Sequence, residues 1–290
     1  MSISQPGKHD LCEFDENYRK LKNLAKHTFE FEFISLDISG KNLSRKKNNQ
    51  RYLVESIGEL KLSMLMVPGG MFEMGSQESK AIPSELPLHT VKVESFLISR
   101  FPITKAQWRE VAKLPQVNMK IPLKPCLLGG KNHPVVDISW YEAFEFCERL
   151  TRKTGRKYRL LAEAEWEYAC RAGTTTPFHF GYSINHKIAN YNSNYANSVD
   201  DFPFPNAFGL QDMHGNVWEW CQDHWHENYQ GAPTESTTPW IADSNNENSN
   251  RVLRGGSWRN EPSLCRSACR FFDSASSRSN NIGFRVACSG

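Results

Sequence analysis

The sequence lacks several features that would assign it at once to a class of protein. None of its apolar runs approaches the roughly 20 residues of a membrane-spanning helix, and its first residues lack the apolar core of a secretory signal. It has no block of basic residues that could follow a phosphate backbone, and its formal net charge is only +3 over 290 residues. We therefore expect a cytoplasmic protein with neither a membrane nor nucleic acid among its partners.

Most of the common metal-binding and catalytic motifs are also missing. The eight cysteines are scattered irregularly and form no CxxC pair, so we expect thiols rather than a zinc site or a disulfide framework. No glycine-rich phosphate loop and no GxSxG motif occurs. His224 and His226 form an HxH pair, for which we favour a surface loop over a transition-metal site.

The composition that is present is typical of an ordered protein, with 39% apolar and 12% aromatic residues. Residues 29–38 alternate apolar and polar side chains, which predicts a half-buried strand. Residues 39–51 are interpreted as a basic turn region, and residues 51–57 and 60–67 as two further strands. We predict a small antiparallel extension over residues 1–64, followed by a main domain over residues 65–290.

Two helices of the main domain have clear start signals. Thr104 is followed by Gln107, and Ser139 by Glu142, which is the capping-box pattern. The second of these helices should end near Gly155, and a third helix is expected within residues 161–173. From about residue 174 the sequence is rich in Asn, Ser, Gly and Pro, which predicts long ordered loops packed on a scaffold.

Seven segments of the main domain form a distinctive series. In chain order they are PGGMFEMGS, FPITKAQW, HPVVDISWYEAFEFC, AEAEWEYACRAG, NAFGLQDMHGNVWEWC, RVLRGGSW and NIGFRVA. This series resembles the formylglycine-generating-enzyme family, the sulfatase-modifying-factor domain. The resemblance implies an α+β protein with a C-type-lectin-like fold of the formylglycine-generating-enzyme type. One departure lies at the third helix, where the family has Pro-Thr and this chain has Leu161 and Ala162, at a cost of about 1 kcal/mol for the lost cap.

The segment DMHGNVWEW resembles a calcium-binding segment of that family. Calcium takes carboxylate and carbonyl oxygens from irregular backbone, which suits such a loop. The alternative is a core loop packed by its two tryptophans. A second family calcium site would begin at Asn190 and Tyr191, but the rest of that loop is shortened here. The ligands implied for the first site are the side chains of Asp212 and Glu219 and the backbone carbonyls of Gly215 and Val217.

The enzymes of this family oxidise a substrate cysteine to formylglycine, with two active-site cysteines that bind copper(I). In this chain the segment between Gly255–Trp258 and Arg266 is shorter than in the oxidases, so neither active-site cysteine has a counterpart. Cys265 and Cys269 remain, but their spacing differs and Cys269 stands where the family has a core alanine. No copper is therefore expected. An oxidase acting on a protein cysteine, with a rearranged thiol pair, remains the alternative.

Other proteins with this fold bind ligands and catalyse no reaction. The segments RVLRGGSW, CRSA and NNIGFRVA resemble variable proteins of diversity-generating retroelements, whose variable region is rewritten at template adenines. Asparagine codons rewritten in this way yield Ser, Phe, Leu, Cys, Arg, Asp, Ala or Asn, among others. Most residues between those segments belong to this set, but Glu261 does not. The resemblance implies a variable region at about residues 258–284.

We therefore expect a non-catalytic protein whose variable region binds a protein ligand, with Phe271 and Phe272 supplying contact area. The alternative is that one of these phenylalanines packs inward. The recurrent arginines 254, 266, 270 and 285 are interpreted as framework, which either pairs with carboxylates such as Glu165 or Glu219 or donates to backbone carbonyls. The predicted contact residues are Trp258, Arg259, Asn260, Ser263, Leu264, Cys269, Phe271, Phe272, Asp273, Ser274 and Ser277.

Overall fold

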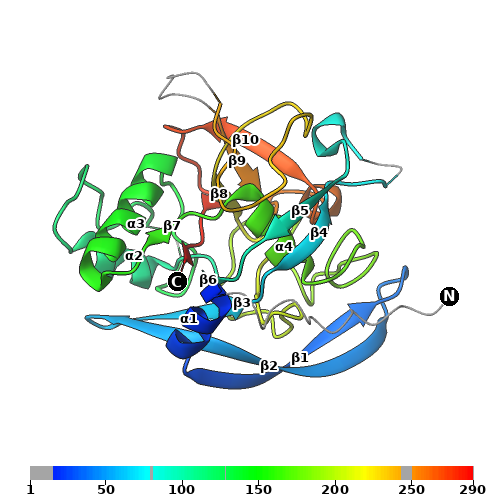
Figure 1. Ribbon diagram of the computed structural model, residues 1–290, viewed down its shortest axis with the longest axis horizontal. Coiled ribbons are helices and arrows are strands. Elements are labelled where there is room, and N and C mark those ends of the chain that lie inside the picture. The colour runs from blue at the N-terminus through cyan, green and yellow to red at the C-terminus, as the bar shows by residue number, and fades with distance from the viewer. Residues whose placement is uncertain (1–15, 79–80, 128, 243–249, 290) are drawn as a thin grey trace.

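The computed structural model describes residues 16–78, 81–127, 129–242 and 250–289. Most of the regular structure lies in three β-sheets (Figure 1). No helix in these residues is long and apolar enough to cross a membrane. The helices are α1 (Glu16–Leu24), α2 (Lys105–Ala112), α3 (Trp140–Thr154) and α4 (Glu163–Arg171), with short 3-10 turns η2 (Pro83–Glu85) and η3 (Pro262–Cys265).

The largest sheet has six strands in the order β1-β2-β3-β6-β12-β7. A four-stranded sheet has the order β10-β9-β8-β11, and β4 pairs with β5. In Figure 1 the β1–β2 ribbon lies at the opposite end of the molecule from β9 and β10. The strands are β1 (His27–Leu36), β2 (Asn42–Ile57), β3 (Leu60–Val67), β4 (Gly70–Met74), β5 (His89–Val93), β6 (Phe96–Ser99), β7 (Tyr158–Arg159), β8 (Trp218–His224), β9 (Asn250–Arg254), β10 (Arg270–Ser274), β11 (Ile282–Gly283) and β12 (Ala287–Cys288).

The strand predicted over residues 29–38 is confirmed as β1, which pairs antiparallel with β2. The basic turn predicted over residues 39–51 is wrong, because β2 already begins at Asn42. Cross-strand charges explain the difference: Arg45 lies 2.9 Å from Glu32, and Lys47 lies 3.2 Å from Glu30. Opposite charges on facing strands stabilise a solvent-exposed ribbon that has little apolar alternation of its own.

The amino-terminal ribbon is continuous with the main sheet. Strand β3 pairs with β2 along one edge and with β6 along the other. The predicted boundary between residues 64 and 65 falls within β3, and the division into two units stays a prediction. Strand β12, near the carboxyl end, lies between β6 and β7 and so connects the two ends of the chain in one sheet.

Both predicted capping boxes are confirmed. The backbone N–H of Gln107 donates to the Thr104 hydroxyl at 3.2 Å, and Thr104 N–H donates back to the Gln107 side chain at 2.9 Å. The same exchange links Ser139 and Glu142 at the start of α3. Helix α3 ends at Gly155, whose φ of 72° is the left-handed conformation that favours glycine.

Helix α4 begins without a side-chain cap, as its sequence predicts. Ala162 occupies the capping position, and its N–H donates to the Glu165 carboxylate at 3.0 Å. Half of the capping box therefore remains. The carboxylate also complements the positive end of the helix dipole.

The core between α2, α3 and the sheets is aromatic. Trp108 of α2 stacks on Phe146 of α3 with 5.7 Å between ring centroids, and Phe284 contacts both rings edge-on. All three side chains are fully buried. Phe284 is the last residue of the predicted variable region, so this packing fixes the carboxyl end of that region to the helices.

Candidate binding surface at the carboxyl end

The predicted variable region leaves β9, forms a loop through η3, returns as β10 and turns into β11. Strand β10 is an edge strand of its sheet and pairs only with β9 in the described part of the chain. Gly256, with φ of +74°, makes the first bend, and a Cβ there would lie 2.6 Å from Cys265 Sγ and 2.8 Å from Leu264 O. Glycine is therefore required where the loop begins.

Arg254, the last residue of β9, holds the middle of this region from inside. Its guanidinium donates to the consecutive carbonyls of Ser267 at 2.9 Å, Ala268 at 3.0 Å and Cys269 at 2.8 Å. It also pairs with Glu167 of α4. The Arg254 side chain is fully buried, so these contacts are shielded from solvent and fix the backbone between η3 and β10.

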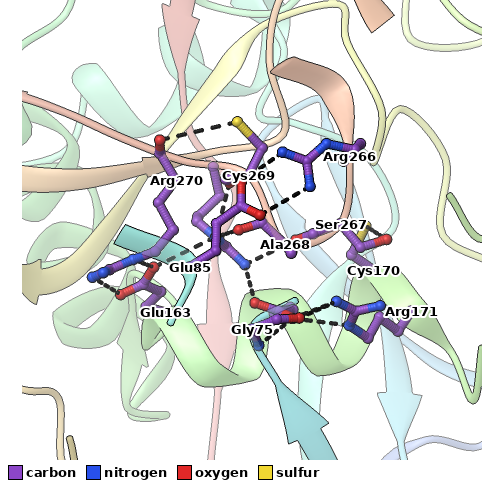
Figure 2. Close-up of polar contacts among 12 residues, drawn as sticks. Gly75, Glu85, Glu163, Cys170, Arg171, Arg266, Ser267, Ala268, Cys269 and Arg270 are labelled. Carbon is purple, nitrogen blue, oxygen red and sulfur yellow. Dashed lines mark hydrogen bonds and ion pairs between the residues drawn. The ribbon is translucent and has the colours of Figure 1, made fainter. Parts of the chain in front are cut away.

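Two further arginines clamp the same segment on either side (Figure 2). Arg266 forms two bonds to Glu85 of η2, at 2.6 and 2.9 Å. Arg270 forms two bonds to Glu163 of α4, also at 2.6 and 2.9 Å. Two parallel N–H···O bonds per pair give geometric specificity as well as energy. We refer to Arg254, Arg266, Arg270 and their carboxylate partners as the arginine frame.

The charges of the frame are mutually compensated. Burial alone would raise the pKa of Glu163, but Arg270 and Arg254 hold it below its ordinary value. Burial alone would lower the pKa of Arg254, but Tyr229, Glu167 and Glu163 raise it. Glu163 is therefore ionised beside its two arginines at neutral pH, and removing either partner would leave a buried charge without compensation.

The prediction that the arginines pair with carboxylates is confirmed, but one named partner is wrong. Arg285 pairs with Glu219, as expected, through bonds of 2.9 and 2.8 Å. Glu165 instead binds Arg159, at 2.6 and 2.7 Å. Glu165 lies six residues from Arg159, so a local partner takes the carboxylate that sequence reasoning assigned to a distant one.

Nine of the eleven predicted contact residues reach solvent. Phe271 is 49% exposed and Leu264 is 37% exposed. Two of the nine also brace the backbone: Asn260 accepts from Ser257 N–H at 3.0 Å, and Asp273 accepts from Ser274 N–H at 2.8 Å. We call these nine the carboxyl-terminal surface; they are Arg259, Asn260, Ser263, Leu264, Phe271, Phe272, Asp273, Ser274 and Ser277.

Two of the predicted contact residues are wrong. Cys269 is fully buried in the main hydrophobic core. Trp258 is only 7% exposed, and its indole N–H is directed at the Asn280 carbonyl at 3.5 Å. Trp258 follows the two bends at Gly255 and Gly256, and this local backbone path, which spacing alone does not reveal, turns the ring inward.

The adjacent phenylalanines lie over two tryptophans. Phe271 stacks on Trp218 with 5.5 Å between ring centroids, and Phe272 packs on Trp225 at 4.6 Å. Phe271 and Phe272 also lie 5.9 Å apart, ring to ring. Neither phenylalanine is fully buried, so neither is ordinary core. Sequence reasoning missed Trp225, which lies far from the variable region in sequence and is recognised only from the contact.

The two cysteines of this region are buried thiols. Cys265 and Cys269 are both fully buried, and burial raises the pKa of each to about 12. Cys265 lies in the cluster with Phe178 and Phe180, whereas Cys269 belongs to the main core. A thiol with such a pKa is protonated at neutral pH, so it is a poor nucleophile and a poor metal ligand.

The predicted calcium donors fit an ion only in part. Asp212 is half-buried, and loss of solvation raises its pKa to about 7 against the lowering effect of Arg285. A cation beside this carboxylate would favour its ionised form. Glu219, however, already accepts two bonds from Arg285 and one from the Trp166 indole at 2.7 Å. A calcium ion would have to replace some of these contacts, and the site stays a prediction.

The surface loop expected for the HxH pair is wrong for His224, which is buried at the end of β8. His224 accepts from Ala242 N–H at 3.2 Å, and burial lowers its pKa to about 4. His226 stacks on Trp240 with 3.6 Å between ring centroids. Within the residues described, no group of three or more His, Cys, Asp or Glu side chains is placed to hold a metal ion.

A family model shows the protein class to which the chain belongs. The chain belongs to the family described as "Sulfatase-modifying factor enzyme 1-like domain", whose model matches residues 54–289. This confirms the resemblance found in the sequence. It also places the family domain across β3, with β2 partly included.

Curated relatives carry different names. "Serine/threonine-protein kinase pkn1" of Chlamydia pneumoniae is 30% identical over 246 residues, which are 77% of this chain and 37% of that protein. "Formylglycine-generating enzyme" of Thermomonospora curvata is 27% identical, with 79% of this chain and 94% of that protein covered. The chain thus spans less than half of the chlamydial relatives it matches, and their full activities do not transfer to it.

Solved structures confirm the predicted α+β, C-type-lectin-like class. PvdO from Pseudomonas aeruginosa superposes with a TM-score of 0.72 and 33% identity, covering 82% of this chain and 98% of that one. Treponema denticola variable protein 1 gives a TM-score of 0.68 at 24% identity, covering 82% and 99%. The second likeness shows the fold alone.

Proposed function

We propose that this protein is a non-catalytic binding protein whose carboxyl-terminal surface recognises a protein ligand and is open to diversification. The observation that carries the proposal is the separation of frame from surface. Arg254 and Arg270 fix the backbone through buried bonds, while the neighbouring Phe271 is half exposed. Apart from Asn260 and Asp273, which accept hydrogen bonds from the local backbone, side chains on such a surface can change without disturbing the contacts that hold the loop.

The composition of the surface favours a protein ligand. Two aromatic rings provide rigid contact area, and Arg259, Asp273 and the serines provide adaptable polar contacts. The two cavities found around Asp223 and around Lys105 are lined by none of the nine residues. A broad, exposed patch without a pocket suits a protein rather than a small molecule.

The edge position of β10 adds a second way to recognise a partner. An edge strand presents unpaired backbone groups along one side, and an extended segment of a partner can add to it. Main-chain bonds of this kind do not depend on the side chains of β10. A partner could therefore keep its docking geometry while the side chains at Phe271 to Ser274 set its specificity.

The alternative function is a formylglycine-generating oxidase acting on a protein cysteine, supported by the family and by relatives with that name. Such an oxidase needs a pair of reactive thiolates. Burial of Cys265 and Cys269, and the rise of both pKa values to about 12, argue against this pair. The local chemistry therefore favours binding.

The proposal is tested by sequencing the locus in several isolates. We expect a neighbouring reverse-transcriptase gene and a template repeat that differs from residues 258–284 at adenines only. Differences between isolates should be concentrated at the codons of the carboxyl-terminal surface, with the codons of Arg254, Arg266 and Arg270 unchanged. A locus without repeat or reverse transcriptase, invariant across isolates, would contradict diversification.

The oxidase alternative is tested on the purified chain. Oxygen consumption is followed with copper(I) and a cysteine-containing peptide, for the wild type and for Cys265→Ser and Cys269→Ser. We expect no peptide-dependent consumption above that of free copper. Turnover that disappears in either serine variant would overturn the proposal in favour of the oxidase.

A further inference from the structure

A cavity of about 210 Å³ lies between the start of α2 and residues 123–127 and 129–131. Its lining includes four basic side chains, those of Lys105, Arg109, Lys124 and Lys131, and no aspartate or glutamate. None of these residues belongs to the carboxyl-terminal surface. In Figure 1 helix α2 lies on the opposite side of the molecule from β5.

Lys105 is the distinctive member of this lining. It is 9% exposed, and its ammonium contacts Cys126 Sγ at 3.8 Å. No carboxylate lies within ion-pair distance of it in the described part of the chain. By contrast, each of the buried arginines 254, 266, 270 and 285 has a carboxylate partner. A largely buried lysine that lines a cavity and has no carboxylate partner is suited to a negative ligand in that cavity.

The backbone N–H groups at the start of α2, beside the cavity, already have acceptors, so a ligand would be bound by side chains. Lys105 and Arg109 are four residues apart in α2 and so lie on one face of the helix. The first helical N–H groups are already used, since Lys105 N–H donates to His133 O and Ala106 N–H donates to Lys131 O, both at 3.0 Å. An anion would therefore be held by the basic side chains, with the helix dipole adding to their potential.

We propose that this cavity binds a phosphate group, as inorganic phosphate or in a small phosphorylated compound. Four cations without a carboxylate favour a tetrahedral dianion over a monovalent carboxylate. The volume is below that of typical pockets for drug-sized ligands, which limits what can accompany the phosphate. The site is separate from the carboxyl-terminal surface, so it stands or falls independently of the binding function proposed above.

The test is calorimetric titration of the full chain with sodium phosphate at pH 7.5, at an ionic strength held constant with sodium chloride. We expect saturable binding with one phosphate per chain. Lys105→Met should weaken binding at least about tenfold, the effect of one charge-assisted hydrogen bond. The matched control is Lys92→Met, an exposed lysine of β5, which should bind phosphate like the wild type.

A second readout reports on the cavity directly. Cys126 lines the cavity beside Lys105, so bound phosphate should slow its alkylation by a neutral reagent in the wild type but not in Lys105→Met. If Lys105→Met does not fold, the double variant Arg109→Gln and Lys131→Gln carries the test, with an expected loss of about tenfold. Absence of saturable binding, or equal binding by the cavity variants and wild type, would overturn the proposal.

Discussion

Removal of Arg254 should destabilise the protein far more than removal of a second arginine on the same strand. The change is Arg254→Met, which keeps the apolar stem of the side chain. It removes three bonds to consecutive backbone carbonyls and the pair with Glu167. The control is Arg251→Met, three residues away on β9, whose half-buried guanidinium donates to Gln222 O and lies 4.0 Å from the Trp140 ring centroid.

The magnitude follows from burial. Arg254 is fully buried, and breaking a buried charge pair by removing one partner costs about 3–5 kcal/mol. Glu167 keeps Arg171 at 2.8 Å, so the lower end of that range applies to the charge, and the unpaired carbonyls add to it. Arg251→Met should cost about 1 kcal/mol, because one hydrogen bond and one ring contact are lost near solvent.

The assay is thermal unfolding together with hydrogen exchange. Arg254→Met should lower the melting temperature by about 10 °C, and amides of residues 267–271 should lose protection. Arg251→Met should leave the exchange of these amides as in the wild type. Equal stability of the two variants, or unchanged protection at residues 267–271 in Arg254→Met, would refute the role assigned to the arginine frame.

Three further predictions follow from burial and pKa. Cys126, only half buried, should react with iodoacetamide at pH 8 well before Cys265 or Cys269, whose pKa values burial raises to about 12; mass spectrometry showing equal labelling would contradict this. Burial raises the pKa of Asp212 from 3.8 to about 7, so its contribution to stability is full below about pH 4 and is lost as pH rises to about 7. Asp212→Asn should therefore gain stability relative to wild type over this interval, and parallel unfolding curves at all pH values would argue against it. Millimolar calcium should raise the melting temperature at pH 7.5 in the wild type but not in Asp212→Asn, and identical melting in calcium and EDTA would contradict the calcium prediction.

Elements with strong local signals could be predicted from the sequence. The boxes at Thr104 and Ser139 define two helix starts, because the side chains that cap them lie within one turn. Strand β1 was found from its alternation. Only the first half of β2 was missed, since a strand was expected over residues 51–57. That half is stabilised by ion pairs to β1 and is largely exposed, which leaves no alternation to detect.

The exposure of most residues of the predicted surface could be anticipated from the sequence, but the contacts that hold them could not. Nine of the residues compatible with diversification reach solvent, yet Cys269 belongs to the same set and is buried. Its burial depends on the bonds from Arg254 to the backbone beside it. Arg266 and Arg270 find their carboxylates 181 and 107 residues away, and no spacing rule connects positions so far apart.

The most direct test of a frame that tolerates surface change is a pair of libraries displayed on cells and challenged with protease. One library randomises the nine residues of the carboxyl-terminal surface with the codon set NNC. The other applies the same codons to buried neighbours, Cys265, Ser267, Ala268, Cys269 and Ala275. We predict that most members of the first library resist protease like the wild type, whereas most members of the second are cleaved. Equal cleavage of the two libraries would contradict the account.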